Sequence, residues 1–211
     1  MIKLKEAQKS GSTAKDPSGR TVFQSSFLYR DLFLNPEHVI SINEEYTSDP
    51  ELKLSRIETT KGAFVVVGSP NSDPGTVLNA GKAYFYYSGS SGWTEYSVTA
   101  SDKAASDNFG SSVSIAKGSF LGTRFAVGAP NADISSFTGS GKVYIYDVDL
   151  SFNITQDGTY LSASDKASGD KFGASIAIKS DGTRIFVGAP SASYLSYTKP
   201  GKVYIFDSGS S

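Results

Sequence analysis

Three segments of the chain repeat one another at a fixed interval of 60 residues. The glycine that closes an apolar run recurs at Gly68, Gly128 and Gly188, and a Gly-Lys pair begins 13 residues after it in every copy. Chance does not hold such spacings constant in three copies. A period of this order indicates a repeat protein, with room in each copy for one four-stranded antiparallel sheet and long loops. The repeat therefore predicts an all-β fold of about three similar four-stranded sheets.

The middle copy shows where the strands of one sheet should lie. Apolar runs predict strands over residues 109–115, 124–130 and 142–147, followed by an outermost strand over residues 160–164. One repeat earlier, the outermost strand corresponds to residues 93–100. The third copy reaches only its third strand, so we expect the last sheet to lack a fourth strand of its own.

A Phe-Gly pair opens two of the copies, at Phe109-Gly110 and at Phe172-Gly173. Stacked sheets cover both faces of their inner strands, so we expect the two phenylalanines to fill the space between adjacent sheets. The glycines either let another backbone approach or adopt a φ that a Cβ disfavours. The first copy lacks the pair but keeps the hairpin of residues 52–67. All of these roles are structural.

The Phe-Gly, Gly-Ala-Pro and Gly-Lys-Val-Tyr elements resemble the FG-GAP repeat, the blade unit of the β-propellers in integrin alpha chains and many microbial surface proteins. The resemblance covers roughly residues 60–207. It implies three four-stranded β-propeller blades within residues 61–211, and a rigid module for adhesion, receptor contact or assembly. Residues 1–60 are expected to form an N-terminal β-rich segment, either a degenerate blade or a small separate module.

In many FG-GAP repeats the hairpin before the Gly-Ala-Pro element carries an acidic loop that binds calcium. Here each hairpin holds at most one acidic residue, as in Asp181-Gly182, which is typical of a plain hairpin turn. We therefore expect no cofactor and no metal. The other acidic candidates are expected to cap turns. They are Asp102, Asp107, Asp165 and Asp170.

Composition argues against several chemistries. The formal net charge is −1, so no basic surplus indicates nucleic-acid binding. The chain has no cysteine and a single histidine, His38, which leaves no Cys-His pair and no histidine metal cluster. No catalytic residue is assigned, and the chain is predicted not to be an enzyme. No apolar run approaches the length of a membrane span, and no signal peptide is visible.

The loops between the Gly-Ala-Pro element and the third strand keep their length while their residues change. They cover residues 71–80, 131–140 and 191–200. Binding residues concentrate on such loops above a rigid scaffold, and exposed aromatic residues suit contacts with protein or sugar. The alternative is ordinary loops whose aromatic side chains pack on neighbouring strands. The candidates for binding a protein or glycan partner are Asp73, Asp133, Phe137, Tyr194 and Tyr197.

These features favour a non-enzymatic binding or structural scaffold on an extracellular surface or a virion. Two alternatives stay open. Residues 34–42 resemble part of short proteins of tailed phages, which favours a virion structural or host-attachment protein. A carbohydrate-binding or carbohydrate-active protein is the other alternative, and an active one would need two carboxylates in a cleft. Closed propellers use about four to eight blades, so we expect three blades to form a homo-oligomer or to join a larger assembly.

Overall fold

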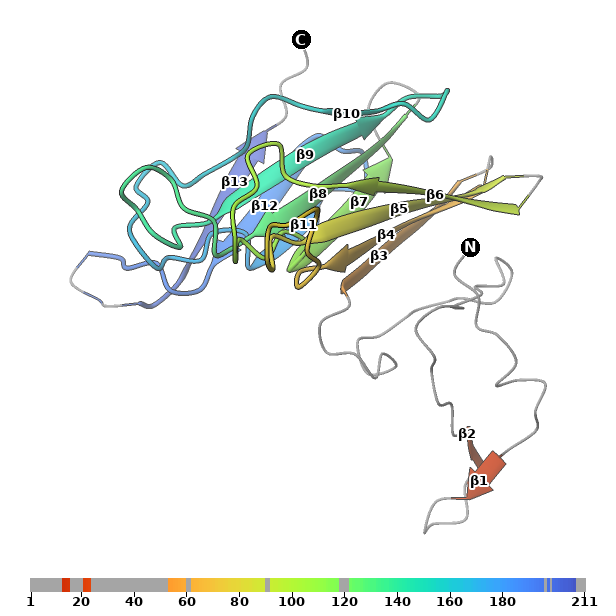
Figure 1. The fold of residues 1–211 in the computed structure, drawn as a ribbon, viewed down its shortest axis with the longest axis horizontal. Coiled ribbons are helices and arrows are strands. Elements are labelled where there is room, and N and C mark those ends of the chain that lie inside the picture. The colour runs from red at the N-terminus through yellow and green to blue at the C-terminus, as the bar shows by residue number, and fades with distance from the viewer. Residues whose placement is uncertain are drawn as a thin grey trace.

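The computed structural model describes residues 13–15, 21–23, 53–59, 62–89, 92–117, 122–195, 197 and 199–207. Every regular element in this part of the chain is a β-strand and none is a helix, which confirms the all-β prediction. Three antiparallel sheets lie against one another (Figure 1). A pair of short strands, β1 (Thr13–Lys15) and β2 (Thr21–Phe23), precedes them in the sequence.

The three sheets are the three copies of the repeat, and we call them blades 1, 2 and 3. In each blade consecutive strands pair, so the chain runs back and forth from the first strand outward. Blade 1 contains β3 (Lys53–Thr59), β4 (Gly62–Ser69), β5 (Lys82–Gly89) and β6 (Gly92–Val98). Blade 2 contains β7 (Ser112–Lys117), β8 (Thr123–Ala129), β9 (Lys142–Val148) and β10 (Ile154–Gln156). Blade 3 contains β11 (Ser175–Ile178), β12 (Arg184–Ala189) and β13 (Lys202–Asp207).

The strand register follows the sequence repeat. Gly128 in β8 pairs with Ser112 on one side and with Val143 on the other. Blades 1 and 3 place Gly68 and Gly188 at the same point between their first and third strands. Residues at equivalent sequence positions therefore occupy equivalent positions in space, and one blade can be compared with the next residue by residue.

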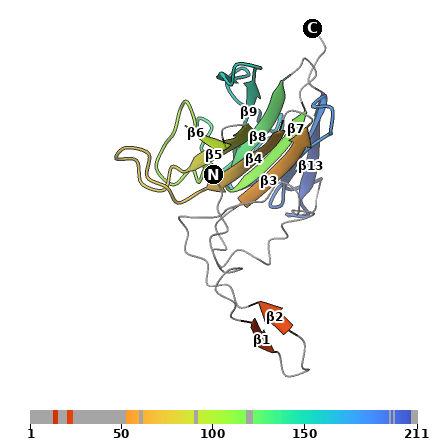
Figure 2. The same cartoon turned by 90° about the vertical axis from the view of Figure 1, so that its right-hand side faces the viewer.

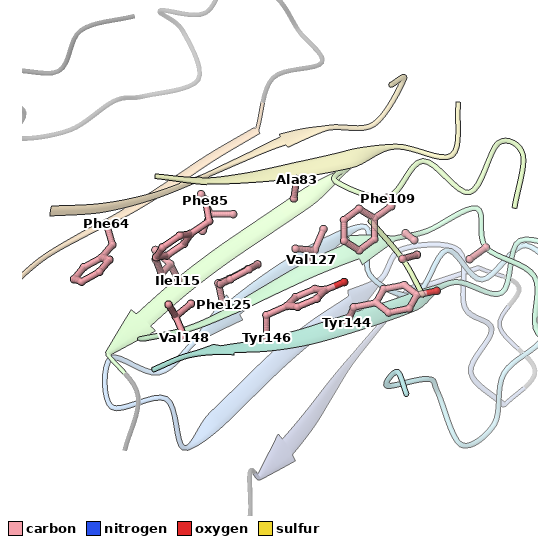
Figure 3. Close-up of a cluster of buried hydrophobic side chains, with 14 residues drawn as sticks. Phe64, Ala83, Phe85, Phe109, Ile115, Phe125, Val127, Tyr144, Tyr146 and Val148 are labelled. Carbon is pink, nitrogen blue, oxygen red and sulfur yellow. The ribbon is translucent and has the colours of Figure 1, made fainter. Parts of the chain in front are cut away.

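The blades pack face to face through apolar side chains. Strands β3 and β4 contact β7, and β7 and β8 contact β11, so the first strands of successive blades lie side by side (Figure 2). Between blades 1 and 2 the rings of Phe85 and Phe125 stack with centroids 5.6 Å apart (Figure 3). Full burial of one such side chain contributes about 1.5–3 kcal/mol. A second cluster lies between blades 2 and 3; it includes Ala126, Val143, Ile145, Phe172, Ile185 and Val187.

The two Phe-Gly pairs lie where the sequence placed them, between adjacent blades. Phe109 and Phe172 are fully buried. Each ring meets the third strand of its own blade edge-on, with centroids 5.4 Å from Tyr144 and Tyr204 respectively. Gly110 has a φ of +100°, and a Cβ at this position would collide with the backbone of blade 1. Glycine is therefore required both for its conformation and for the close approach of two backbones.

Two strand predictions are wrong in detail. The first strand of blade 2 begins at Ser112 rather than at Phe109, because the Phe-Gly pair forms a turn before it. The fourth strand of blade 2 is β10, whereas residues 160–164 contribute only an isolated bridge between Val143 and Leu161. Strand β6, at residues 92–98, agrees with the prediction for blade 1. Blade 3 has three strands among its described residues, as expected.

The boundary drawn at residue 60 falls inside a hairpin. Strand β3 pairs with β4 along its whole length, so residues 53–59 are part of blade 1. Blade 1 therefore begins before the division between residues 1–60 and 61–211. The phage-like stretch 34–42, which includes His38, lies outside the described residues.

Candidate binding surface

The loops that follow the second strand of each blade, residues 71–80, 131–140 and 191–200, are called the GAP loops here. A polar side chain closes each of them. Asp73 accepts a hydrogen bond from the backbone N–H of Asn79 (2.6 Å), and Asp133 accepts one from Gly139 (2.7 Å). In blade 3 a serine hydroxyl takes the place of the carboxylate. The two aspartates that we predicted to bind a partner are thus engaged in holding their own loops.

The tips of the GAP loops of blades 2 and 3 share one backbone motif. Ile134 and Phe137 exchange two backbone hydrogen bonds of 3.1 and 2.9 Å, and Tyr194 and Tyr197 exchange two of the same lengths. Each pair closes a tight turn, and the residue that follows its first member, Ser135 or Leu195, has a positive φ. The backbone therefore fixes the positions of the candidate aromatic residues Phe137, Tyr194 and Tyr197.

Apolar side chains gather at the tip of the blade 3 loop. Leu195 is 83% exposed and Tyr197 is 67% exposed. Tyr194 is also exposed, and its ring centroid lies 5.8 Å from the ammonium nitrogen of Lys202. Phe137 in the blade 2 loop is less exposed than these three. Sequence reasoning missed Leu195, whose only signal was its position between two tyrosines. In Figure 1 this loop extends beyond the ends of β12 and β13.

The segments that lead into the first strands of blades 2 and 3, residues 101–111 and 164–174, are called connectors here. Each connector braces the GAP loop of the blade before it. The backbone N–H of Phe109 donates to the carbonyl of Ala80 (2.9 Å), and that of Phe172 donates to the carbonyl of Ser140 (2.9 Å). Among the described residues, the blade 3 loop has no such brace from a following connector; its Ser191 donates its N–H to the carbonyl of Asp170 in the connector that precedes blade 3 (3.2 Å). The loop with the most exposed apolar side chains is therefore the one that no Phe-Gly turn braces within the described part of the chain.

An aspartate in each connector holds the third strand of the blade that the connector leads into, and we call this set of contacts the clamp. Asp102 accepts hydrogen bonds from the Lys142 ammonium (2.7 Å) and from the Tyr144 hydroxyl (2.5 Å). The prediction that this aspartate and its counterpart cap turns is wrong, because their carboxylates reach into the neighbouring blade instead. The same set recurs one blade later as Asp165, Lys202 and Tyr204.

The clamp is built for charge pairing rather than for proton transfer. Burial alone would raise the pKa of Asp102, but hydrogen bonds from Lys142 and Tyr144 outweigh it and hold the pKa below its ordinary value. Burial and the nearby carboxylate raise the pKa of Tyr144. At neutral pH Asp102 is therefore a carboxylate and Tyr144 a neutral phenol. Neither of these two groups titrates near neutrality, so the pair is poorly suited to acid–base catalysis.

Other acidic residues have local structural partners. Asp107 accepts a hydrogen bond from the backbone N–H of Ala104 (2.8 Å), and Asp170 accepts one from Ala167 (2.7 Å), so these two do cap turns. Asp181, in the hairpin before β12, accepts a hydrogen bond from the backbone N–H of Thr183. Within the described part of the chain, no three His, Cys, Asp or Glu side chains gather as a metal site requires. No described helix could cross a membrane.

A family model described as "FG-GAP repeat" matches residues 93–146 and residues 157–206. Each match starts with the outer part of one blade and ends in the third strand of the next. It therefore contains, in one unit, the clamp aspartate, the Phe-Gly turn and the Lys-Val-Tyr strand that the structure brings together. No curated protein matches the chain.

Proposed function

Residues 93–146 and 157–206 of this chain are FG-GAP repeats, and from that premise we propose that the chain is a non-enzymatic scaffold that binds a protein partner through the GAP loop of blade 3. Repeats of this family generally form propeller-like binding or structural modules. The observation that carries the proposal is the cluster of Tyr194, Leu195 and Tyr197, which is the most exposed group of apolar side chains on a GAP loop.

The chemistry of this loop suits a protein surface. Tyrosine is enriched at the centres of protein interfaces because it offers a rigid apolar body and a polar tip. The loop contains no Asp, Glu, Asn or Gln. It therefore lacks the carboxylate and amide groups that fix the orientation of sugar hydroxyls by paired hydrogen bonds. These properties favour a protein over a glycan as the partner of the loop.

The support beneath the loop favours tight rather than adaptable binding. Two backbone hydrogen bonds lock Tyr194 to Tyr197, and Lys202, which approaches the Tyr194 ring, is itself held by Asp165 (2.6 Å). A preorganised loop loses little conformational freedom on binding, so more of the contact energy appears as affinity. The blades thus provide a fixed platform and the loop provides the contact.

The proposal can be tested by probing the full chain against a peptide array and a glycan array. A Tyr194→Ser/Tyr197→Ser double variant should lose the peptide signals of the wild type by at least about tenfold, a typical hot-spot effect. The matched control is Leu150→Ser, which removes an exposed apolar side chain in the turn between β9 and β10, at the opposite end of β9 from the blade 2 GAP loop. Peptide signals that survive in the double variant, or glycan signals that vanish in it, would refute a protein partner at this loop.

A further inference from the structure

A cleft of about 530 Å³ opens on the face of blade 3 that points away from blade 2. It lies between the end of the second strand, the start of the third strand and the two ends of the GAP loop. It is lined by the equivalents of residues that contact the next blade elsewhere in the chain. Among these lining residues are Ser175, Gly188, Pro200, Gly201 and Val203.

In blades 1 and 2 the same place is filled by the Phe-Gly turn of the next blade. A Cβ on Gly128 would overlap the carbonyl oxygen of Gly173, and a Cβ on Gly141 would overlap the backbone of Phe172. Gly68 and Gly81 of blade 1 make room for Phe109 and Gly110 in the same way. Two glycines per blade therefore admit a Phe-Gly backbone.

Blade 3 keeps both glycines, but among the described residues no Phe-Gly turn lies against them. The three described atoms nearest to a Cβ on Gly188 all belong to Ser175, and those nearest to a Cβ on Gly201 all belong to Pro190, at 3.3 Å or more. Both contacts lie within blade 3 itself. The cleft thus has the shape of the place that holds the Phe-Gly turn in blades 1 and 2, which we call the Phe-Gly receptor. In blade 3 no described residue fills it.

The polar groups of the receptor are also present. Ser112 Oγ donates to the carbonyl of Gly173 (2.6 Å) across the interface of blades 2 and 3, and Ser175 occupies the equivalent position in the cleft. The carbonyl of Ser140 accepts the N–H of Phe172. Its equivalent is the carbonyl of Pro200, which a proline can supply as well as any other residue. One donor and one acceptor are therefore placed for the backbone of a Phe-Gly turn.

The apolar wall of the receptor is uncovered. Val203 is 70% exposed, whereas its counterpart Val143 in blade 2 is fully buried against blade 3. Ile205 and Phe186 are exposed on the same face. A contiguous apolar surface beside a shaped cleft marks an interaction site rather than an ordinary protein surface.

We propose that this cleft binds the Phe-Gly turn of a further FG-GAP blade carried by another polypeptide. The chain contains Phe-Gly only at residues 109–110 and 172–173. Both of these phenylalanines are fully buried between blades, so an intact second copy has no spare turn to donate. Residues 1–211 therefore offer no free turn for this cleft, and the partner that we propose is a different chain that presents an aromatic residue followed by glycine and then a β-strand. The proposal concerns a different surface from the GAP-loop tip, and either can fail without the other.

The probe is a synthetic peptide with the sequence of residues 164–176, the connector that blade 3 itself uses. It should bind the full-length protein in solution, with the largest amide chemical-shift changes at Gly188, Gly201 and Val203. The same peptide with its phenylalanine replaced by alanine should bind at least about tenfold more weakly, since a buried aromatic anchor dominates such contacts. A cyclised peptide should bind more tightly than the linear one because its turn is already formed.

The protein variants are Val203→Glu and Ile205→Lys, both at exposed positions, so neither should lower the melting temperature appreciably. Each should weaken peptide binding at least about tenfold, and Leu150→Glu should leave it unchanged. Failure of both the linear and the cyclised peptide to bind would overturn the proposal, as would equal binding to Val203→Glu. A wild-type dimer in light scattering that becomes a monomer in Val203→Glu would show instead that a second copy occupies the face. Tyr194→Ser/Tyr197→Ser should bind the peptide normally, which separates this site from the loop site.

Discussion

Truncation of Phe172 to alanine should destabilise the protein by about 3–5 kcal/mol, the usual cost of deleting a buried aromatic ring. The ring is fully buried between blades 2 and 3, where it lies edge-on to Tyr204 and Phe206 with centroids 5.4 and 5.8 Å away. Each such aromatic pair contributes about 0.5–1.5 kcal/mol beyond its burial, which favours the upper part of the range. With a urea m-value of about 2 kcal/mol per molar, the unfolding midpoint should fall by about 2 M.

The assay is urea denaturation followed by circular dichroism, and the control is Tyr194→Ala. Tyr194 lies on the exposed loop tip, so its truncation should cost less than about 1 kcal/mol. Blades in a linear stack depend on their nearest neighbours. Because Trp93 lies in blade 1, its fluorescence should therefore respond less to Phe172→Ala than the circular dichroism signal does. Equal losses in the two variants would show that core and loop have been confused.

Three further predictions follow from the same contacts. Calcium should not raise the melting temperature measured with and without a chelator, because the hairpin before β12 offers one aspartate already bonded to Thr183; a large rise with stoichiometric metal would refute this. The pKa of Asp102 is lowered in the folded state. Its contribution to stability is therefore complete above the ordinary carboxyl value of about 3.9 and is lost as the pH falls through the folded value. Asp102→Asn should lose less stability than the wild type when unfolding is measured from about pH 5 to about pH 2, and parallel losses would contradict the clamp. Gly128→Ala should cost about 1–3 kcal/mol through overpacking against the Gly173 carbonyl. Gly188→Ala should cost less, since only Ser175 must move, and equal costs in denaturant unfolding would argue that blade 3 is covered.

The sequence predicted the inner part of each blade well, because inner strands are covered on both faces and read as apolar runs. The second and third strands of blade 2 lie within one residue of their predicted ends. The outermost strand was misplaced because β10 is three residues long and its middle residue, Thr155, is exposed, so it carries no apolar run. The Phe-Gly turn was taken for strand because Phe109 extends the apolar run of the strand that follows, although the special φ expected of Gly110 is present.

The candidate binding surface could be predicted only in part. The GAP loops and the aromatic residues at their tips could be predicted, because these loops keep the same length in every copy while their residues change. The roles of Asp73 and Asp133 could not, because a carboxylate that closes its own loop looks the same in sequence as one that awaits a partner. A signal for the Asp102 clamp was present, however. Lys142 and Tyr144 recur in every copy inside an otherwise apolar strand, and buried polar groups of this kind require partners.

The central claim is that the chain repeats one blade interface and leaves the last one open. Hydrogen exchange of the equivalent strands β9 and β13 tests it most directly, because they have the same Lys-Val-Tyr-Ile sequence and differ in what covers them. The amides of β9, between β8 and β10 and beneath blade 3, should be strongly protected. Those of β13 should exchange much faster, and should slow when the Phe-Gly peptide of residues 164–176 is added. Equal protection of β9 and β13 in the protein alone would show that the outer face of blade 3 is already covered and would contradict this account.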